Sequence, residues 1–494
     1  MSLSSRKSHP SLESVGTCEA WRSVERRGSR SLAEGRVEGP TVPGPARYGR
    51  PKWESRAARN GSVTPMTAAS GPYLRRVLDD ELDVLLNNLP ALALEGAKAV
   101  GKTASASQRA SIVYELDDPA QRAVLEADID RLVSEPAPVL IDEWQYLPAV
   151  WDRVRRAVDE GAPPGRFLFT GSASPAGTGT HTGGGRIVSL RMRPLSLAER
   201  LGLRNTVRLT DLLTGERAKV DGRSTVSLSD YTNEILRSGF PGLRHLSGRP
   251  LRAQLDGYLQ RVVDRDFPEL GHRSVRNPTA LRRWMAAYAA ATATTATFET
   301  IRDAATSGEG RKPAKSTTAP YRDVLQRLFI MDPVPAWTPS RSHIAELALP
   351  PKHHFADPAL AARLVGATAL SLLQGEAPGP PIPRDGTFLG ALFESLVTQS
   401  VRVYAQMADA KVAHFRTHRG DHEADLIVER QDGRVVAIEV KLGQTADSGA
   451  VRHLKWLSDQ LGEDLLDAVV ITTGKDAFRR SDGIAVVPAA LLGP

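Results

Sequence analysis

From Tyr73 onward the chain alternates between short apolar runs and stretches with an apolar residue every three or four positions. The first pattern is typical of buried strands and the second of amphipathic helices. Alternating strands and helices predict an α/β domain with a parallel sheet, which we place at 66–225. We expect strands over 91–94, 111–116, 138–141, 166–170 and 188–190, and helices over 73–89, 120–134 and 148–160.

The remaining chain divides into two further regions. Residues 226–345 have mostly helical spacing, with helices over 281–295, 297–305 and 316–329 before a β-like segment, as in a winged helix. In that arrangement Lys312, Lys315 and Arg322 would face DNA; the alternative is a helical bundle that only joins its neighbours. Residues 346–385 read as a connector. Residues 386–494 form a second α/β unit, with helices over 388–405 and 449–461 and strands over 412–416, 424–429, 435–441, 467–472 and 484–487.

The first 65 residues have no sustained apolar period and are rich in Ser, Gly, Arg and Pro. We expect them to be a disordered basic arm, or to precede the true start at Met66. They hold 12 Lys and Arg against 6 Asp and Glu, so most of the net charge of +7 lies there. The nearly neutral remainder gives no electrostatic reason to expect DNA binding by the folded domains.

A phosphate-binding loop follows the first predicted strand. The segment matches G-x-x-x-x-G-K-[ST] between a strand and a helix, which is the context that this motif requires. Its backbone N–H groups would surround phosphate oxygens, Lys102 would reach the β- and γ-phosphates, and Thr103 would ligate Mg²⁺. The predicted nucleotide-binding residues are Gly96, Ala97, Lys98, Ala99, Val100, Gly101, Lys102 and Thr103.

Two acids complete this predicted ATP site. An apolar strand ends at Asp142, which would hold the Mg²⁺ shell, and at Glu143, which would polarise the attacking water. Thr170 and Ser172 end a neighbouring strand and are candidate sensors of the γ-phosphate, although a plain strand end is the alternative. Candidates for an arginine finger are Arg186 and Arg265, with Arg193 and Arg261 also available.

The order of these motifs resembles a family of prokaryotic AAA-type ATPases with a C-terminal domain of unknown function (DUF4143). The resemblance rests on Gly101-Lys102-Thr103, Ile141–Gln145, Leu168–Ser172, Arg193–Ser196, Gly239-Phe240-Pro241, Tyr258–Asp266 and Phe355–Leu360. It covers about residues 70–490 and implies ATP binding, a winged-helix-like middle and a nuclease-like C-terminal fold. The loop departs from the family, since Ala97-Lys98-Ala99 replaces a more usual Pro-Arg-Gln type.

The C-terminal unit carries a second group of candidate residues: Glu394 on a helix, Asp425 on a strand, and Glu439 and Lys441 on the next strand. This order resembles the restriction-endonuclease-like fold. The Asp-Gly turn at 432–433 predicts antiparallel strands with Asp425 opposite Glu439. The three carboxylates could bind Mg²⁺ or Mn²⁺ for a nuclease, or Lys441 could neutralise them without any metal.

Composition narrows the setting. Cys18 is the single cysteine, which excludes an internal disulfide and suits a reducing cytoplasm. No apolar run approaches the length of a membrane span, and no secretory signal is recognisable. We therefore expect a cytoplasmic ATPase with ATP and Mg²⁺ as cofactors and no membrane partner. The alternative is an ATP-gated module, antitoxin-like or defence-like, that binds DNA or a protein with little turnover. A homo-oligomer is compatible with both.

Overall fold

The computed structural model describes residues 73–172, 184–271, 277–306, 315–337, 350–384, 386–417, 420–446 and 448–494. The arm expected over 1–65 lies outside these residues. No helix in the described ranges combines the length and apolar character that crossing a bilayer requires.

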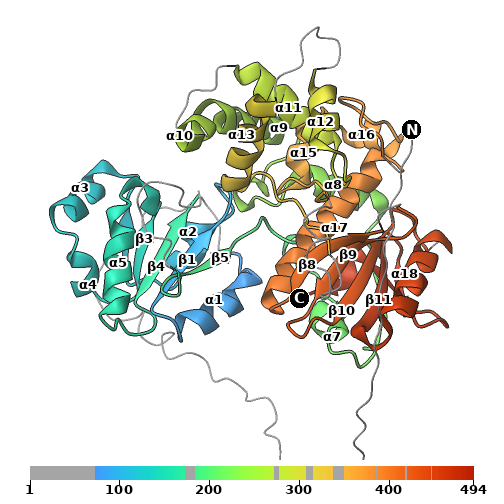
Figure 1. Cartoon of the computed structure of the whole chain (residues 1–494), viewed down its shortest axis with the longest axis horizontal. Helices are drawn as coiled ribbons and strands as arrows, with labels where there is room; N and C mark the ends of the chain where they lie inside the picture. Colours follow the sequence, from blue (N-terminus) through green and yellow to red (C-terminus); the bar gives the residue numbers. More distant parts are fainter. Residues whose placement is uncertain are drawn as a thin grey trace, which may run out of the picture. The chain divides into compact units, whose positions relative to one another are not determined.

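The first domain contains a five-stranded, fully parallel sheet in the order β2-β3-β4-β1-β5. Most of its residues are buried on both faces, as in a parallel sheet covered by helices (Figure 1). The strands expected from apolar runs are all present, so the predicted parallel α/β fold is confirmed. The strands are β1 (Ala91–Glu95), β2 (Ile112–Glu115), β3 (Val139–Asp142), β4 (Phe167–Gly171) and β5 (Val188–Arg191).

The two faces of this sheet belong to different apolar cores. Leu92 and Leu94 of β1 pack with α1, whereas Ala91 and Ala93 point to the opposite core. The helix predicted over 120–134 is wrong as a single element, because it is interrupted at Asp128–Asp130. The helices are α1 (Leu78–Leu86), α2 (Lys102–Ser107), α3 (Pro119–Ala127), α4 (Arg131–Ser134), the 3₁₀ turn η2 (Trp144–Tyr146) and α5 (Ala149–Asp159).

The chain that follows β5 leaves this sheet. After α6 (Leu197–Leu201) come β6 (Val207–Arg208), α7 (Leu209–Leu212) and β7 (Gly222–Arg223). Strand β6 pairs with β14, and β7 pairs with β12 of the C-terminal sheet. Residues near the end of the span 66–225 therefore contribute to the C-terminal unit in the structure.

The middle region is helical, as predicted, and it includes the segment that we expected to be a connector. Helix α15 packs against α8 and α11, and short antiparallel bridges join Met331 to Phe355 and Val334 to Lys352. Its elements are α8 (Leu228–Arg237), η3 (Pro241–Leu243), α9 (Gly248–Arg261), the π-helix η4 (Val262–Asp266), α10 (Phe267–Gly271), α11 (Pro278–Ala290), α12 (Phe298–Ala305), α13 (Lys315–Arg327), α15 (Pro358–Leu364) and α16 (Ala369–Leu373).

The C-terminal unit is a mixed seven-stranded sheet in the order β7-β12-β13-β11-β10-β9-β8. Apolar residues on one face pack with α17 and those on the other face with α18 (Figure 1). Its further elements are α17 (Phe388–Met407), β8 (Lys411–Arg416), β9 (Glu423–Glu429), β10 (Val435–Val440), α18 (Ser448–Leu461), η5 (Gly462–Asp464), β11 (Leu465–Thr472), β12 (Asp476–Arg479), β13 (Ala485–Pro488), η6 (Ala489–Leu491) and β14 (Leu492–Gly493).

Candidate functional site

The loop between β1 and α2 has the tight backbone that its glycines predict. A Cβ on Gly96 would lie 2.2 Å from the carbonyl oxygen of Met192, so no larger residue fits there. Gly101 has a φ of 102° and is the residue that precedes α2. Ala99 also has a positive φ, of 67°, which favours glycine and marks a sharply bent loop.

Lys102 closes the loop on itself. Its Nζ donates to the carbonyl oxygens of Gly96 and Ala97, both at 3.0 Å, and the residue is buried. Burial lowers the pKa of Lys102 to about 8, although Glu143 and Asp142 raise it. An anion placed in the loop would restore the charged amine, so this environment suits a phosphate group.

Asp142 lies directly beside the loop. Its Oδ1 accepts a hydrogen bond from Thr103 at 2.8 Å and another from the hydroxyl of Thr170. Burial raises the pKa of this carboxyl, while the two hydroxyls lower it. Strands β3 and β4 are parallel neighbours, which explains why Thr170 reaches Asp142. A hydroxyl and a carboxylate at this edge are hard oxygen donors of the kind that Mg²⁺ prefers.

Glu143 follows Asp142 in the left-handed region, with a φ of 50°. Its carboxylate accepts a hydrogen bond from Ser172 at 3.1 Å and another from the amide of Gln145. The structure thus brings Thr170 and Ser172 each to one of the two acids. Gln145 was missed as a site residue, although it stands two positions after Glu143 within a quoted motif.

Two of the arginine-finger candidates form ion pairs with nearby acidic side chains. Arg186 pairs with Asp159 at 2.6 Å, and Arg265 pairs with Glu269 at 2.8 Å. Arg261 is exposed at the end of α9. None of these geometries selects a finger, so that assignment stays a prediction.

Two arginines at the end of β5 instead contact the middle region. Arg193 pairs with Asp332 at 2.7 Å, and Arg191 lies 3.6 Å from the same carboxylate. Burial lowers the pKa of Arg191 to about 10, and its charge in turn lowers the pKa of Lys102. Arg191 is therefore a missed neighbour of the phosphate site, and no motif in the sequence marks it.

Residues expected to face DNA are engaged elsewhere or undescribed. Lys315 pairs with Glu299 at 2.5 Å, and Arg322 pairs with Asp323 at 3.1 Å. Lys312 lies outside the described residues. These contacts give no support to the DNA-facing interpretation of the middle region.

The C-terminal candidates converge largely as the turn predicts. Strands β9 and β10 pair antiparallel with Leu426 opposite Ile438, which sets Asp425 opposite Glu439. Lys441 Nζ lies 2.8 Å from Glu439 Oε1. Asp425 Oδ2 accepts the backbone N–H of Val440 at 2.8 Å.

A residue that the sequence analysis missed lies at the centre of this cluster. Lys352, from the expected connector, places Nζ 2.8 Å from both Glu394 and Asp425. The ammonium thus takes the position between two carboxylates that we had assigned to a metal ion or to Lys441. Among the described residues, no group of three or more His, Cys, Asp and Glu side chains is arranged to hold a metal. The metal-binding interpretation of Glu394, Asp425 and Glu439 stays a prediction.

Burial and mutual charge interactions shift the pKa values of the carboxyl groups in this cluster. Burial, followed by the charge of Asp425, raises the pKa values of Glu394 and Glu439 to about 8. Burial opposes ionisation of Asp425 as well, but Lys352 and Lys441 hold its pKa below the ordinary value. Lys352 and Lys441 therefore favour the charged form of Asp425, whereas burial favours the protonated forms of the two glutamates.

Three models of protein families match separate parts of the chain. Residues 88–201 match the family model of an AAA domain, and residues 389–492 match a domain of unknown function (DUF4143). The chain carries an AAA-type domain and a C-terminal DUF4143 domain. Between them, residues 228–371 match another domain of unknown function (DUF8612). The predicted combination of an AAA-type P-loop domain with a DUF4143 domain is confirmed.

Two relatives match most of the chain. They are the uncharacterized proteins Rv2008c of Mycobacterium tuberculosis and Mb2031c of Mycobacterium bovis, each 25% identical over 442 residues. The alignment covers 87% of this chain and 88% of each relative. A Walker-type ATPase of Pyrococcus abyssi matches at 15% identity and a TM-score of 0.35, over 58% of this chain and 94% of its own. That similarity is too weak to support inference.

Proposed function

We propose that this protein binds ATP with Mg²⁺ in the loop at 96–103 and hydrolyses it in the cytoplasm. The observation that carries the proposal is the meeting of three elements at one oxygen. Thr103 of α2 and Thr170 of β4 both donate to Asp142 Oδ1 at the end of β3. This arrangement places the metal-ligand candidates directly beside the phosphate loop, where Mg²⁺ would offset the charge of the β- and γ-phosphates.

The chain's own residues divide the work. Lys102 exchanges its two carbonyl contacts for phosphate oxygens and regains full charge. Thr103 and Asp142 supply the protein oxygens to the metal. Glu143 orients the attacking water, and Thr170 and Ser172 hold the two acids in register with the sheet edge.

A second candidate follows from the state of Glu143. Its carboxylate already accepts two hydrogen bonds, from Ser172 and Gln145, which compete with a water molecule. Such an arrangement favours slow turnover. The alternative function is therefore an ATP-gated regulatory module, whose partner is DNA, a protein or a second copy of the chain.

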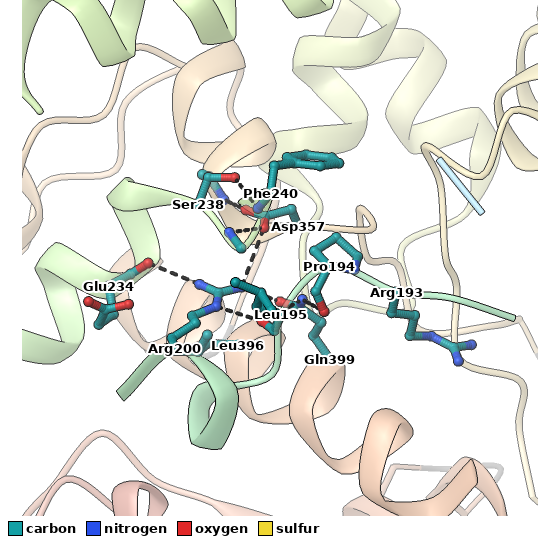
Figure 2. A network of polar contacts seen from close by, with 12 residues as sticks. Arg193, Pro194, Leu195, Arg200, Glu234, Ser238, Phe240, Asp357, Leu396 and Gln399 are labelled. Atoms are coloured by element: carbon teal, nitrogen blue, oxygen red, sulfur yellow. Dashed lines mark hydrogen bonds and ion pairs between the residues drawn. The ribbon is translucent and has the colours of Figure 1, made fainter. Parts of the chain in front are cut away.

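We also propose that nucleotide state is coupled to the other domains through a continuous polar network. Arg76 donates to Val100 O in the phosphate loop at 2.9 Å and pairs with Glu199 at 2.8 Å. The next residue, Arg200, is fully buried and pairs with Asp357 at 3.3 Å (Figure 2). The network thus runs from the loop to the helical middle region.

Its last members reach the C-terminal helix. Arg200 donates to Gln399 of α17 at 2.7 Å, and Gln399 donates back to the carbonyl oxygen of Pro194 at 3.0 Å (Figure 2). Asp357 accepts the backbone N–H of Gly239 at 2.6 Å. Because partly satisfied buried polar networks are costly, a shift of the loop favours a joint shift of these contacts.

Cleavage of nucleic acid is not part of the proposal. Lys352 fills the space between Glu394 and Asp425, and this contact favours a structural role for the C-terminal cluster. The C-terminal domain then serves as the element moved or presented by the ATPase domain.

One experiment separates the candidates. ATP binding and hydrolysis are measured for the wild type, Lys102→Ala and Glu143→Gln, with and without DNA and RNA. Hydrolysis that disappears in both variants supports the ATPase. Binding without turnover under every condition supports the regulatory module, and no nucleotide binding by the wild type rejects both.

A further inference from the structure

The phosphate loop contains a second lysine that is held by the middle region. Lys98 Nζ lies 2.6 Å from Asp266 Oδ1, and the two residues are 168 positions apart in the chain. Asp266 ends the π-helix η4 and has a side chain only 6% exposed, whereas that of Lys98 is 33% exposed. The ion pair therefore joins a buried carboxylate to an amine that solvent can still reach.

The backbone of Lys98 is fixed separately from its side chain. Tyr258, from α9, donates its hydroxyl to Lys98 O at 3.2 Å. Tyr258 packs against Phe240 with ring centroids 5.0 Å apart. With the carbonyl anchored, the flexible part is the four-carbon side chain of Lys98, which can rotate without moving the loop.

The charge of the Lys98 amine also interacts with residues of the proposed catalytic site. Burial opposes the charge of Lys98, but Asp266 and then Glu143 raise its pKa. The charge of Lys98 adds to the effect of burial in lowering the pKa of Lys102. Lys98 stands within the phosphate loop, four positions before Lys102, so its side chain is a candidate partner of the γ-phosphate. ADP lacks this group.

We propose that Lys98 is the residue that distinguishes ATP from ADP, and that Asp266 and the γ-phosphate compete for its amine. This inference rests on the proposed nucleotide site. With ADP the pair to Asp266 stays closed. With ATP the amine turns to the γ-phosphate, and the released Asp266 changes the packing of η4. A π-helical turn suits this role, because such turns are uncommon and concentrate at functional sites.

Nucleotide affinity tests the competition directly. Binding of ADP and of a non-hydrolysable ATP analogue is measured by calorimetry. In Lys98→Gln, the analogue should lose about tenfold in affinity or more, with ADP nearly unchanged, because a charge-assisted hydrogen bond to the γ-phosphate is absent. Lys98→Arg should keep most of the preference. Asp266→Asn should strengthen analogue binding several-fold, since the competing carboxylate is gone.

A matched control lies in the same π-helix. Asp264 is exposed and contacts Gln260, so Asp264→Asn removes one negative charge near η4 without touching Lys98. It should bind both nucleotides like the wild type. In a Lys98→Gln background, Asp266→Asn should have no further effect on analogue affinity, because the amine for which Asp266 competes is absent.

Hydrogen exchange gives an independent readout. Exchange of the backbone amides over 258–266 should rise when the analogue binds, should not rise with ADP, and should not respond to the analogue in Lys98→Gln. Equal losses for ADP and analogue in Lys98→Gln, or weaker analogue binding in Asp266→Asn, would overturn the inference while leaving the ATP site intact. A wild type that binds neither nucleotide would reject the proposed function as well.

Discussion

The phosphate site and the C-terminal cluster both gather carboxylates and lysines, yet they neutralise charge differently. Asp142 accepts hydrogen bonds from two neutral hydroxyls, of Thr103 and Thr170, and within the described part of the chain no ion pair neutralises it. Asp425 instead contacts the ammonium of Lys352 at 2.8 Å. The carboxylate of Asp142 can therefore be neutralised by a bound cation, whereas that of Asp425 is already neutralised by a lysine of the chain.

The difference shows why acidic residues alone are a poor guide to a metal site. In the C-terminal unit, the predicted strands, register and facing carboxylates are all present. One lysine from another part of the chain changes what they can do. A candidate site therefore has to be judged by the cation that is already present as much as by its anionic groups.

The largest expected effect is on nucleotide binding. Lys102→Ala should abolish ATP binding, because the loop loses the buried amine whose positive charge would neutralise the phosphates. Isothermal calorimetry measures it. Lys352→Met is the contrasting variant and should leave ATP affinity unchanged. If Lys102→Ala retained tight binding, the loop at 96–103 would not be the phosphate site.

The next effect concerns stability. Lys352→Met should destabilise the protein by about 3–5 kcal/mol, the usual cost of breaking a buried ion pair from one side. Urea unfolding measures it. The additional change Asp425→Asn should recover part of the loss, because Asp425, whose pKa lies below its ordinary value, is the charge left stranded. Lys441→Met is the control and should cost less, since Lys441 is 34% exposed. Tight Mn²⁺ binding by the wild type, lost in Asp425→Ala, would contradict the self-neutralised cluster.

Turnover gives a third contrast between the regions. Glu143→Gln should keep ATP affinity and lose about a hundredfold or more in hydrolysis rate, as expected when a general base is removed. The measurement is phosphate release at saturating ATP. The corresponding C-terminal change, Glu439→Gln, should leave the rate unaltered. A wild-type rate in Glu143→Gln would assign the water to another residue.

The phosphate site could be predicted from the sequence more completely than the C-terminal cluster, for a physical reason. The strands before Gly96 and Asp142 are local patterns, and the loop motif fixes its residues by spacing, so both could be predicted. Lys352 is one lysine without periodicity, and its role depends on packing against a helix and a strand more than 40 residues away. The pair Lys98 and Asp266 was likewise invisible, although each residue stood within a recognised motif.

The sequence was also limited where local signals compete. The helix predicted over 120–134 ends early at Asp128, because residues with turn preference interrupt an apolar spacing that continues beyond them. Short pairings such as β7 with β12 join segments far apart and carry no pattern of their own. Such contacts are decided by tertiary packing.

The smallest expected effect is a pH dependence that belongs to the C-terminal cluster. The pKa values of Glu394 and Glu439 are raised to about 8, above those of the unfolded chain. The folded state then binds more protons than the unfolded state from about pH 4.5 to about pH 8, so stability falls as pH rises through this window. The buried histidines His353 and His414 have pKa values lowered to about 4. Their contribution rises with pH instead, and it is complete above about pH 7 because the unfolded imidazole is then neutral.

Between about pH 7 and about pH 9 the buried Lys102, whose pKa is lowered to about 8, contributes in the opposite sense to the glutamates, because its folded form loses the proton first. A comparison of the wild type with Glu439→Gln therefore isolates the carboxyl contribution. Measured by urea unfolding, the free energy of unfolding of the wild type should fall relative to that of Glu439→Gln as pH rises through this window, because the glutamine cannot ionise. Glu143→Gln, in the phosphate site, should follow the wild-type curve. A wild-type curve that stays parallel to that of Glu439→Gln across this window would mean that Glu439 is ionised throughout. Its pairing with Lys441 at 2.8 Å would then outweigh the effect of burial.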